Sequence, residues 1–173
     1  MFTRFLRPLF PAIGALIAVL VLLAFENTTD LTMLMAPFGA SCVIVFALPD
    51  SPLARPRNVI GGHVISALTG LIVYHTFGNH IWSIALAVAL SVYLMQVTGT
   101  IHPPAGADPI VVILAGAGWS FLFAPVLAGA VILVGLSALY RFILKRRAQQ
   151  QQRQQQAATI TKPAIVNSNS TSA

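Results

Sequence analysis

His102 is the residue in this sequence best placed to take part in chemistry, because it stands immediately before Pro103 and Pro104 within apolar sequence. A neutral imidazole donates one hydrogen bond, whereas an imidazolium adds a charge that would couple ligand binding to pH. Asp108 follows closely and is the only acidic residue between Asp50 and the chain end. An acid within apolar sequence is a functional candidate by default, although bonding to His102 or nearby amides is the simpler alternative. The pair predicts a site that binds an anion or handles a proton.

Hydroxyl side chains and a second histidine extend this candidate site. Thr98 and Thr100 precede His102, and Ser41 lies in an earlier apolar run, but such hydroxyls often bond only to their own helix. His63 follows two glycines near the start of another run, where a structural role is the simpler alternative. The two histidines and the acid are candidates for proton linkage. The sequence has no HExxH motif and no nucleophile–base spacing, so we predict no metal site, no cofactor and no enzyme.

The proline motif occurs twice, over residues 36–40 and 103–107, reading Ala-Pro-Phe-Gly-Ala and Pro-Pro-Ala-Gly-Ala. Pro104 lies 67 positions after Pro37 (104 − 37 = 67), and the same offset pairs Gly62 with Gly129. Internal duplication around interrupted apolar segments is typical of transporters, whose site lies where the broken segments meet.

Composition places the whole chain in a membrane. Hydrophobic residues make up 57% and charged residues 8%, with a mean hydropathy of +0.82. An ordinary soluble domain has about 25% charged residues. The net charge is +6, and eight of the ten basic residues lie in clusters, at Arg4 and Arg7, at Arg55 and Arg57, and over residues 141–147. Such clusters are typical of cytoplasmic helix ends rather than of a nucleic-acid surface.

Six apolar runs predict an all-α membrane protein with six transmembrane segments, near 8–25, 33–48, 59–77, 81–98, 103–118 and 121–140. Only six crossings place all three basic clusters on one side, with both termini in the cytoplasm. Each repeat, about 8–77 and 78–142, then holds an odd number of crossings, which predicts an inverted 3+3 repeat. We expect a membrane domain over 1–147 and a disordered, Gln-rich cytoplasmic tail over 148–173.

Each proline motif predicts the start of a short helix, because proline favours the first helical turn and extends the residues before it. We therefore expect residues 31–36 and 98–102 to be extended. A helix over 37–48 is about 18 Å long, too short for a hydrocarbon core of roughly 30 Å, so its start lies inside the membrane. Two helix N-termini meeting there would attract an anion. Ordinary proline kinks packed through small residues are the alternative.

The predicted substrate-binding residues come from the two motifs and their flanks: Pro37, Gly39, Ser41, Thr98, Thr100, His102, Pro103, Pro104 and Gly106.

The stretches over residues 98–109, 37–40 and 56–63 resemble the HPP family of integral membrane proteins, named for the triplet that is His102-Pro103-Pro104 here. The resemblance covers roughly residues 5–142. Members in plastids and cyanobacteria are associated with nitrite transport, which implies a small-anion pathway. The family is often described with four spans, whereas the charge pattern favours six.

We therefore expect a protein of a bacterial inner membrane that passes a small monovalent anion, with nitrite implied by the resemblance. Its expected partners are this inorganic anion and the lipid bilayer, without nucleic acid, and a homo-oligomer is left open. One alternative is an intramembrane enzyme that uses His63, His102 and Asp108 as a metal or acid–base site. A non-transporting assembly partner is the other.

Overall fold

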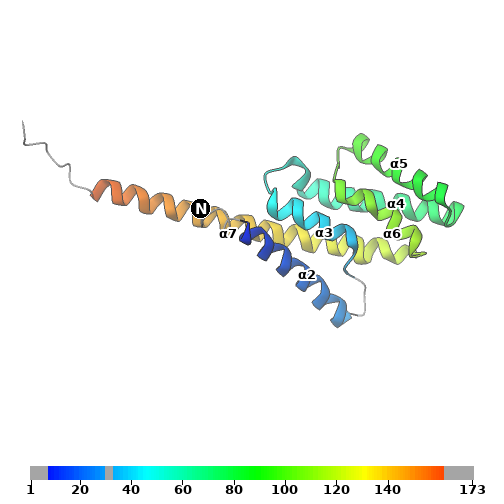
Figure 1. Ribbon diagram of the computed structural model, residues 1–173, viewed down its shortest axis with the longest axis horizontal. Coiled ribbons are helices and arrows are strands. Elements are labelled where there is room, and N and C mark those ends of the chain that lie inside the picture. The colour runs from blue at the N-terminus through cyan, green and yellow to red at the C-terminus, as the bar shows by residue number, and fades with distance from the viewer. Residues whose placement is uncertain (1–7, 30–32, 162–173) are drawn as a thin grey trace, which may run out of the picture. The chain divides into compact units, whose positions relative to one another are not determined.

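The computed structural model describes residues 8–29 and 33–161, which form helices and connecting turns without a strand (Figure 1). The helical elements in chain order are α2 (Leu9–Thr29), α3 (Ala36–Cys42), η1 (Val43–Ala47), η2 (Pro52–Ala54), α4 (Pro56–Phe77), α5 (Ile81–Thr98), η3 (Pro103–Ala107), α6 (Asp108–Leu114), η4 (Trp119–Leu122), η5 (Phe123–Leu127) and α7 (Ala128–Thr161).

Both proline motifs begin short helices, as predicted. Met35 is extended (φ −131°, ψ 150°) before α3, and His102 is extended (φ −137°, ψ 100°) before η3. Thr98 differs from the prediction, because it is the last residue of α5 rather than part of the extended segment. Gly99 ends that helix in the left-handed region (φ 65°), which glycine adopts at little cost. The helix therefore stops after Thr98.

Four helical segments are long and apolar enough to cross a membrane: Leu9–Thr28, Pro56–Phe77, Ile81–Thr98 and Trp119–Ala157. Two apolar segments are shorter, Ala36–Ala47 and Pro103–Leu114. The all-helical membrane class is thus confirmed, with the second and fifth segments short. The number of crossings and the inversion of the repeats stay predictions.

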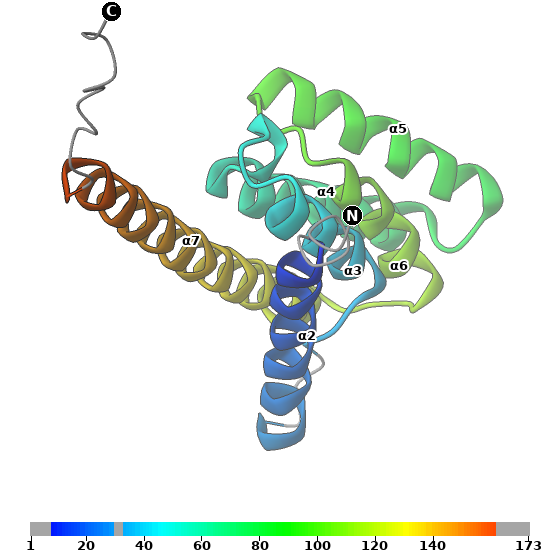
Figure 2. The ribbon, with the colours of Figure 1, turned by 60° about the vertical axis from the view of Figure 1, so that its left-hand side comes forward.

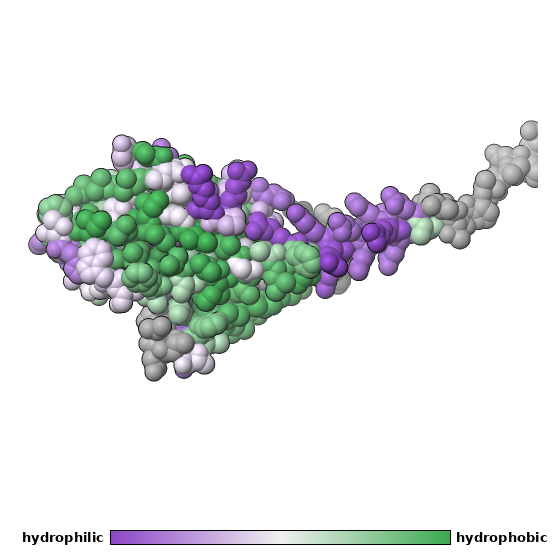
Figure 3. Space-filling model, turned by 180° about the vertical axis from the view of Figure 1, so that it is seen from behind, coloured by the Kyte–Doolittle hydropathy of each residue, from purple (hydrophilic) through white to green (hydrophobic). Residues whose placement is uncertain are grey.

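Helix α4 is central to the unit formed by residues up to Tyr140, since it contacts α5, α6, η3 and η5. Helix α5 lies at the edge of this unit in both ribbon views (Figures 1 and 2). A hydrophobic cluster joins α4 to α3 and the start of α7 through Phe38, Val59 and Leu133. Apolar side chains also cover most of the face of this unit that Figure 3 shows, as expected where lipid is the solvent.

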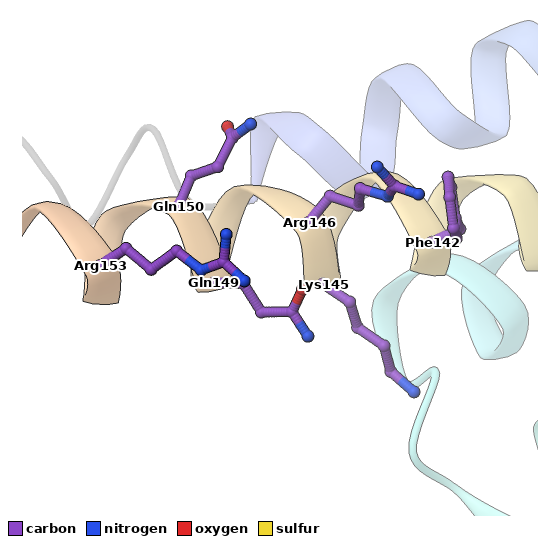
Figure 4. A pocket seen from close by; sticks show the side chains of 6 residues that line it. All are labelled: Phe142, Lys145, Arg146, Gln149, Gln150 and Arg153. Atoms are coloured by element: carbon purple, nitrogen blue, oxygen red, sulfur yellow. The ribbon is translucent and has the colours of Figure 1, made fainter.

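The described residues from Arg141 to Thr161 belong to a separate compact unit. The structure differs here from the predicted disorder, because α7 continues as a helix through residues 148–161, while residues 162–173 lie outside the described part. Gln, Ala and Arg all favour helices, which explains the difference. The helix is hydrophilic here (Figure 3), and its side chains line a pocket with the Arg146 guanidinium 4.7 Å from the Phe142 ring centroid (Figure 4).

Candidate functional site

The start of α4 packs closely on the segment that leads into the His-Pro-Pro triplet. A Cβ added to Gly62 would lie 2.8 Å from His102 Cβ and 3.0 Å from the Thr100 carbonyl oxygen. Only a residue without a side chain permits this approach. Gly62 therefore brings the next residue of α4, His63, beside His102, and their ring centroids are 5.1 Å apart.

Four fully buried side chains form one continuous series of hydrogen bonds, which we call the buried polar chain: Asp108, His63, Ser41 and His102. His63 Nδ1 lies 2.8 Å from Asp108 Oδ2, and His63 Nε2 lies 2.8 Å from Ser41 Oγ. Ser41 Oγ lies 2.9 Å from His102 Nε2. The chain ends at the backbone of η2, where His102 Nδ1 is 3.0 Å from the Leu53 carbonyl oxygen.

Neighbouring groups hold this chain in place. The ring of Phe38 packs edge-on against His63 with centroids 5.1 Å apart. Ser66, one turn further along α4, donates to the Ala105 carbonyl at 2.6 Å and so fixes η3 against α4. The Ser41 hydroxyl also lies 3.2 Å from the Pro37 carbonyl one turn earlier in α3. The buried polar chain therefore joins α3, α4 and α6 to η2 and to the residue before η3, and has little freedom to shift.

The buried polar chain follows the internal duplication. The offset that separates Pro37 from Pro104 also separates Ser41 from Asp108 (108 − 41 = 67). Ser41 lies on the first short helix and Asp108 on the second, and both bond to the single ring of His63. One histidine thus bridges equivalent positions of the two repeats.

The model of the HPP transmembrane region matches residues 3–150, which is most of the sequence. The chain belongs to the HPP family of transmembrane proteins. It is similar to two transmembrane proteins of Dictyostelium discoideum, 41% identical over 68% of this chain and 45% of the relative, and 36% identical over 76% and 46%. It spans about half the length of these curated relatives. No solved structure matches it.

In this HPP protein the other predicted site residues are more dispersed. Thr98 and Thr100 bond each other through their hydroxyls at 2.8 Å, with Thr98 exposed and Thr100 buried. Of the two prolines after His102, Pro103 is exposed and Pro104 buried. The backbone is open at both motif glycines, because a Cβ at Gly39 or at Gly106 would meet nothing within 4 Å.

Gly39 nevertheless lies away from the buried polar chain. It lines an apolar groove together with Pro11, Cys42 and Phe46. The first amides of both short helices are also partly satisfied, since Phe38 N–H donates to the Met35 carbonyl and Ala105 N–H to the His102 carbonyl. The polar character of the site therefore comes mainly from side chains rather than from the helix ends.

Sequence reasoning missed two features of this HPP site. It found no nucleophile–base spacing, whereas the fold brings the Ser41 hydroxyl onto His63 from another helix. The equal spacing of Ser41 and Asp108 within the duplication was the available signal. The role of the Leu53 carbonyl had no signal, because any residue supplies a carbonyl. Within residues 8–29 and 33–161, no group of three or more His, Cys, Asp or Glu side chains is arranged to hold a metal ion.

Proposed function

We propose that this protein passes a small monovalent anion, such as nitrite, across the membrane through a site at the junction of α3 with η3 and α6. One observation carries the proposal: His63 bridges Ser41 and Asp108, which are equivalent positions of two short, proline-initiated helices. Transporters built from inverted repeats place their site near the midplane, where discontinuous helices from the two repeats meet. We propose further that the membrane is a bacterial inner membrane, with both termini in the cytoplasm.

Reciprocal backbone contacts support a twofold relation between the repeats. A Cβ at Gly62 would lie 3.0 Å from the Thr100 carbonyl oxygen, and a Cβ at Gly129 would lie 3.3 Å from the Met33 carbonyl oxygen. Gly62 and Gly129 are 67 positions apart, as are Met33 and Thr100. Contacts exchanged in this way are expected of a twofold axis, as at the interface of a symmetric dimer. They favour the inverted 3+3 arrangement.

The chemistry of the site favours a small anion with a single charge. The sequence has no Lys or Arg between Arg57 and Arg141, so no permanent cation belongs to α5, η3 or α6. The donors available are two imidazoles and a hydroxyl. They can bind an anion by hydrogen bonds and, when an imidazole is protonated, by its positive charge. A transported ion must bind well enough to enter and weakly enough to leave.

The test is anion flux into proteoliposomes that contain the purified protein, with nitrite, nitrate, formate and chloride at two pH values. His102→Ala should reduce flux by about tenfold or more, because a hydrogen bond to a charged group is worth about 1.5–3 kcal/mol and about 1.4 kcal/mol is a factor of ten. Its matched control is His75→Gln, because His75 stacks on Trp119 outside the buried polar chain. Absence of flux for all four anions in the wild type would contradict the proposal.

A second candidate function rests on the order of groups Ser41, His63 and Asp108. Hydroxyl, imidazole and carboxyl follow one another at 2.8 Å and 2.8 Å, as in the triads of serine hydrolases. Labelling of Ser41 by a fluorophosphonate probe, lost in Ser41→Ala, would favour this enzyme over the transporter. We expect no labelling, because Ser41 is fully buried and also bonds His102.

A further inference from the structure

The Leu53 carbonyl fixes the direction of hydrogen bonding through the buried polar chain. A carbonyl oxygen only accepts, so His102 Nδ1, 3.0 Å away, carries a hydrogen. In a neutral His102 ring, Nε2 is then an acceptor, and the Ser41 hydroxyl donates to it. A hydroxyl has one hydrogen, and the His102 nitrogen at 2.9 Å is nearer to Ser41 Oγ than the competing Pro37 carbonyl at 3.2 Å. With its hydrogen given to His102, Ser41 accepts a hydrogen bond from His63 Nε2.

The same reasoning reaches Asp108 and makes it a neutral acid. A neutral His63 with its hydrogen on Nε2 has a bare Nδ1, to which Asp108 Oδ2 must donate. The other carboxyl oxygen, Oδ1, is buried and meets no donor among the described residues. An unpartnered oxygen costs less in a neutral acid than in a buried carboxylate. All four bonds of the chain are therefore made without a buried charge.

We propose that the buried polar chain is a proton relay that begins at Asp108 Oδ1 and ends at His102. A proton bound at Oδ1 allows the Oδ2 proton to pass to His63 Nδ1. The Nε2 proton of His63 then passes to Ser41 Oγ, and the hydroxyl proton of Ser41 passes to His102 Nε2. Asp108, Ser41 and His63 end neutral, and His102 becomes an imidazolium. Each hydrogen bond between the four side chains survives with its direction reversed.

Other ionisable groups on the surrounding elements are engaged elsewhere or exposed. They are Cys42 in the hydrophobic cluster, Glu26 on the Met33 amide, Arg57 on the Thr98 carbonyl, Tyr74 and His75 in ring contacts near Trp119, Tyr140 on Phe46, and the exposed Asp50, Arg55 and Tyr93. The pH response of the site is therefore assigned to the four side chains of the buried polar chain.

The role of this relay in coupling rests on the proposed anion transport. The positive charge on His102 exists only after proton uptake, so each monovalent anion is drawn in together with one proton. Transport is then electrically neutral, and flux rises as the pH falls on the side that supplies the proton.

The first test reads the ring protons directly and does not depend on transport. ¹⁵N-histidine NMR in lipid nanodiscs would use the variant with His75→Gln and His80→Gln, which leaves only the two chain histidines of the four in the sequence. Near neutral pH, we expect the hydrogen on Nδ1 of His102 and on Nε2 of His63. On acidification, His102 should gain its second hydrogen first. The opposite tautomers, or a His63 that gains its second hydrogen before His102 does, would overturn the relay.

The second test measures proteoliposomes with an internal pH dye during anion influx. Wild-type protein should take up one proton for each anion. Ser41→Ala should lose the proton uptake, and Ser41→Thr, which keeps a hydroxyl, should restore it. Anion flux without proton uptake in the wild type would refute the relay and leave transport standing. Absence of anion flux together with the expected tautomers would refute transport and leave the relay standing.

Discussion

At the scale of single residues, Asp108 is the side chain on which the protonation of the site depends. It is fully buried at the first position of α6, and its one described partner is His63 at 2.8 Å. Because Asp108 donates to an imidazole nitrogen in the neutral chain, a neutral amide can take its place in that bond.

Asp108→Asn should therefore keep the fold nearly as stable as the wild type, whereas Asp108→Ala should not. The amide of asparagine can still donate to His63 Nδ1. Alanine leaves that nitrogen buried without a partner, which costs about 1–3 kcal/mol. Thermal unfolding in nanodiscs would measure the difference. Equal melting temperatures for the two variants would contradict the role given to this hydrogen bond.

Four of the candidate residues named from the sequence lie together in the structure. His102, Asp108, Ser41 and His63 were all candidates from the sequence, and the fold brings these four into contact. The central position of His63 was not predicted, because a histidine after two glycines equally suits a packing role. Contacts between residues on different helices depend on tertiary packing, which the local sequence does not specify.

At the scale of elements, the pairing of α4 with the 100–105 segment depends on Gly62. A methyl group there would lie 2.8 Å from His102 Cβ and 3.0 Å from a backbone oxygen. The backbone oxygen cannot rotate away as a long side chain would, so the helix itself must move. Gly135 in α7 is the matched comparison, because a Cβ there meets nothing within 4 Å.

Gly62→Ala should destabilise the protein by about 1–3 kcal/mol, the usual cost of overpacking a core. Gly135→Ala should be neutral or stabilise the protein by up to about 1 kcal/mol, since alanine favours a helix. Chemical denaturation in detergent, followed by circular dichroism, would compare the two. If the Gly62→Ala protein is as stable as the Gly135→Ala protein, the contact between α4 and the 100–105 segment is looser than the structure indicates.

The hydrophilic part of α7 should bind anionic lipid headgroups. Lys145, Arg146 and Arg153 line one pocket with Gln149 and Gln150 (Figure 4). Each basic residue near an anionic surface contributes about 1 kcal/mol. Changing all three basic residues to Gln should reduce the phosphatidylglycerol retained in native mass spectrometry. Changing Gln149 and Gln150 to Ala is the control, and an equal loss in both variants would contradict the prediction.

Elements were more predictable than contacts. Proline at both motif starts and glycine at residue 99 mark helix boundaries through local backbone geometry, which the sequence carries directly. The tail was not foreseen as a helix, because its lack of apolar residues suggested disorder while its Gln and Ala residues favour a helix. Composition and helix propensity pointed in opposite directions there.

At the scale of the whole molecule, the prediction of six crossings has a direct test by cysteine labelling. Arg55→Cys and Gln150→Cys should react with an impermeant maleimide from one side of the membrane, and Thr28→Cys from the other. The native Cys42 is buried and should stay unlabelled. Labelling of Arg55→Cys from the same side as Thr28→Cys would refute six crossings and the inversion of the repeats.

The order of the apolar segments and the shortness of the second and fifth followed from hydropathy alone, since burial in lipid leaves a strong compositional signal. The way in which the two repeats contact each other did not follow, because a duplication in sequence is compatible with several arrangements in space. The close backbone contacts at Gly62 and at Gly129 favour one arrangement of the repeats, but they are visible only once the fold is known.

The bond between His102 and the Leu53 carbonyl ties a deeply enclosed ring to a short turn between helices. No substitution of the Leu53 side chain can delete that acceptor, because it is a backbone carbonyl. The conformation of the turn therefore determines which nitrogen of His102 carries the hydrogen. A binding event that bends residues 51–54 would free the imidazole to exchange its hydrogen between nitrogens. Displacement of this connecting turn would thus change the protonation of the buried His102 ring.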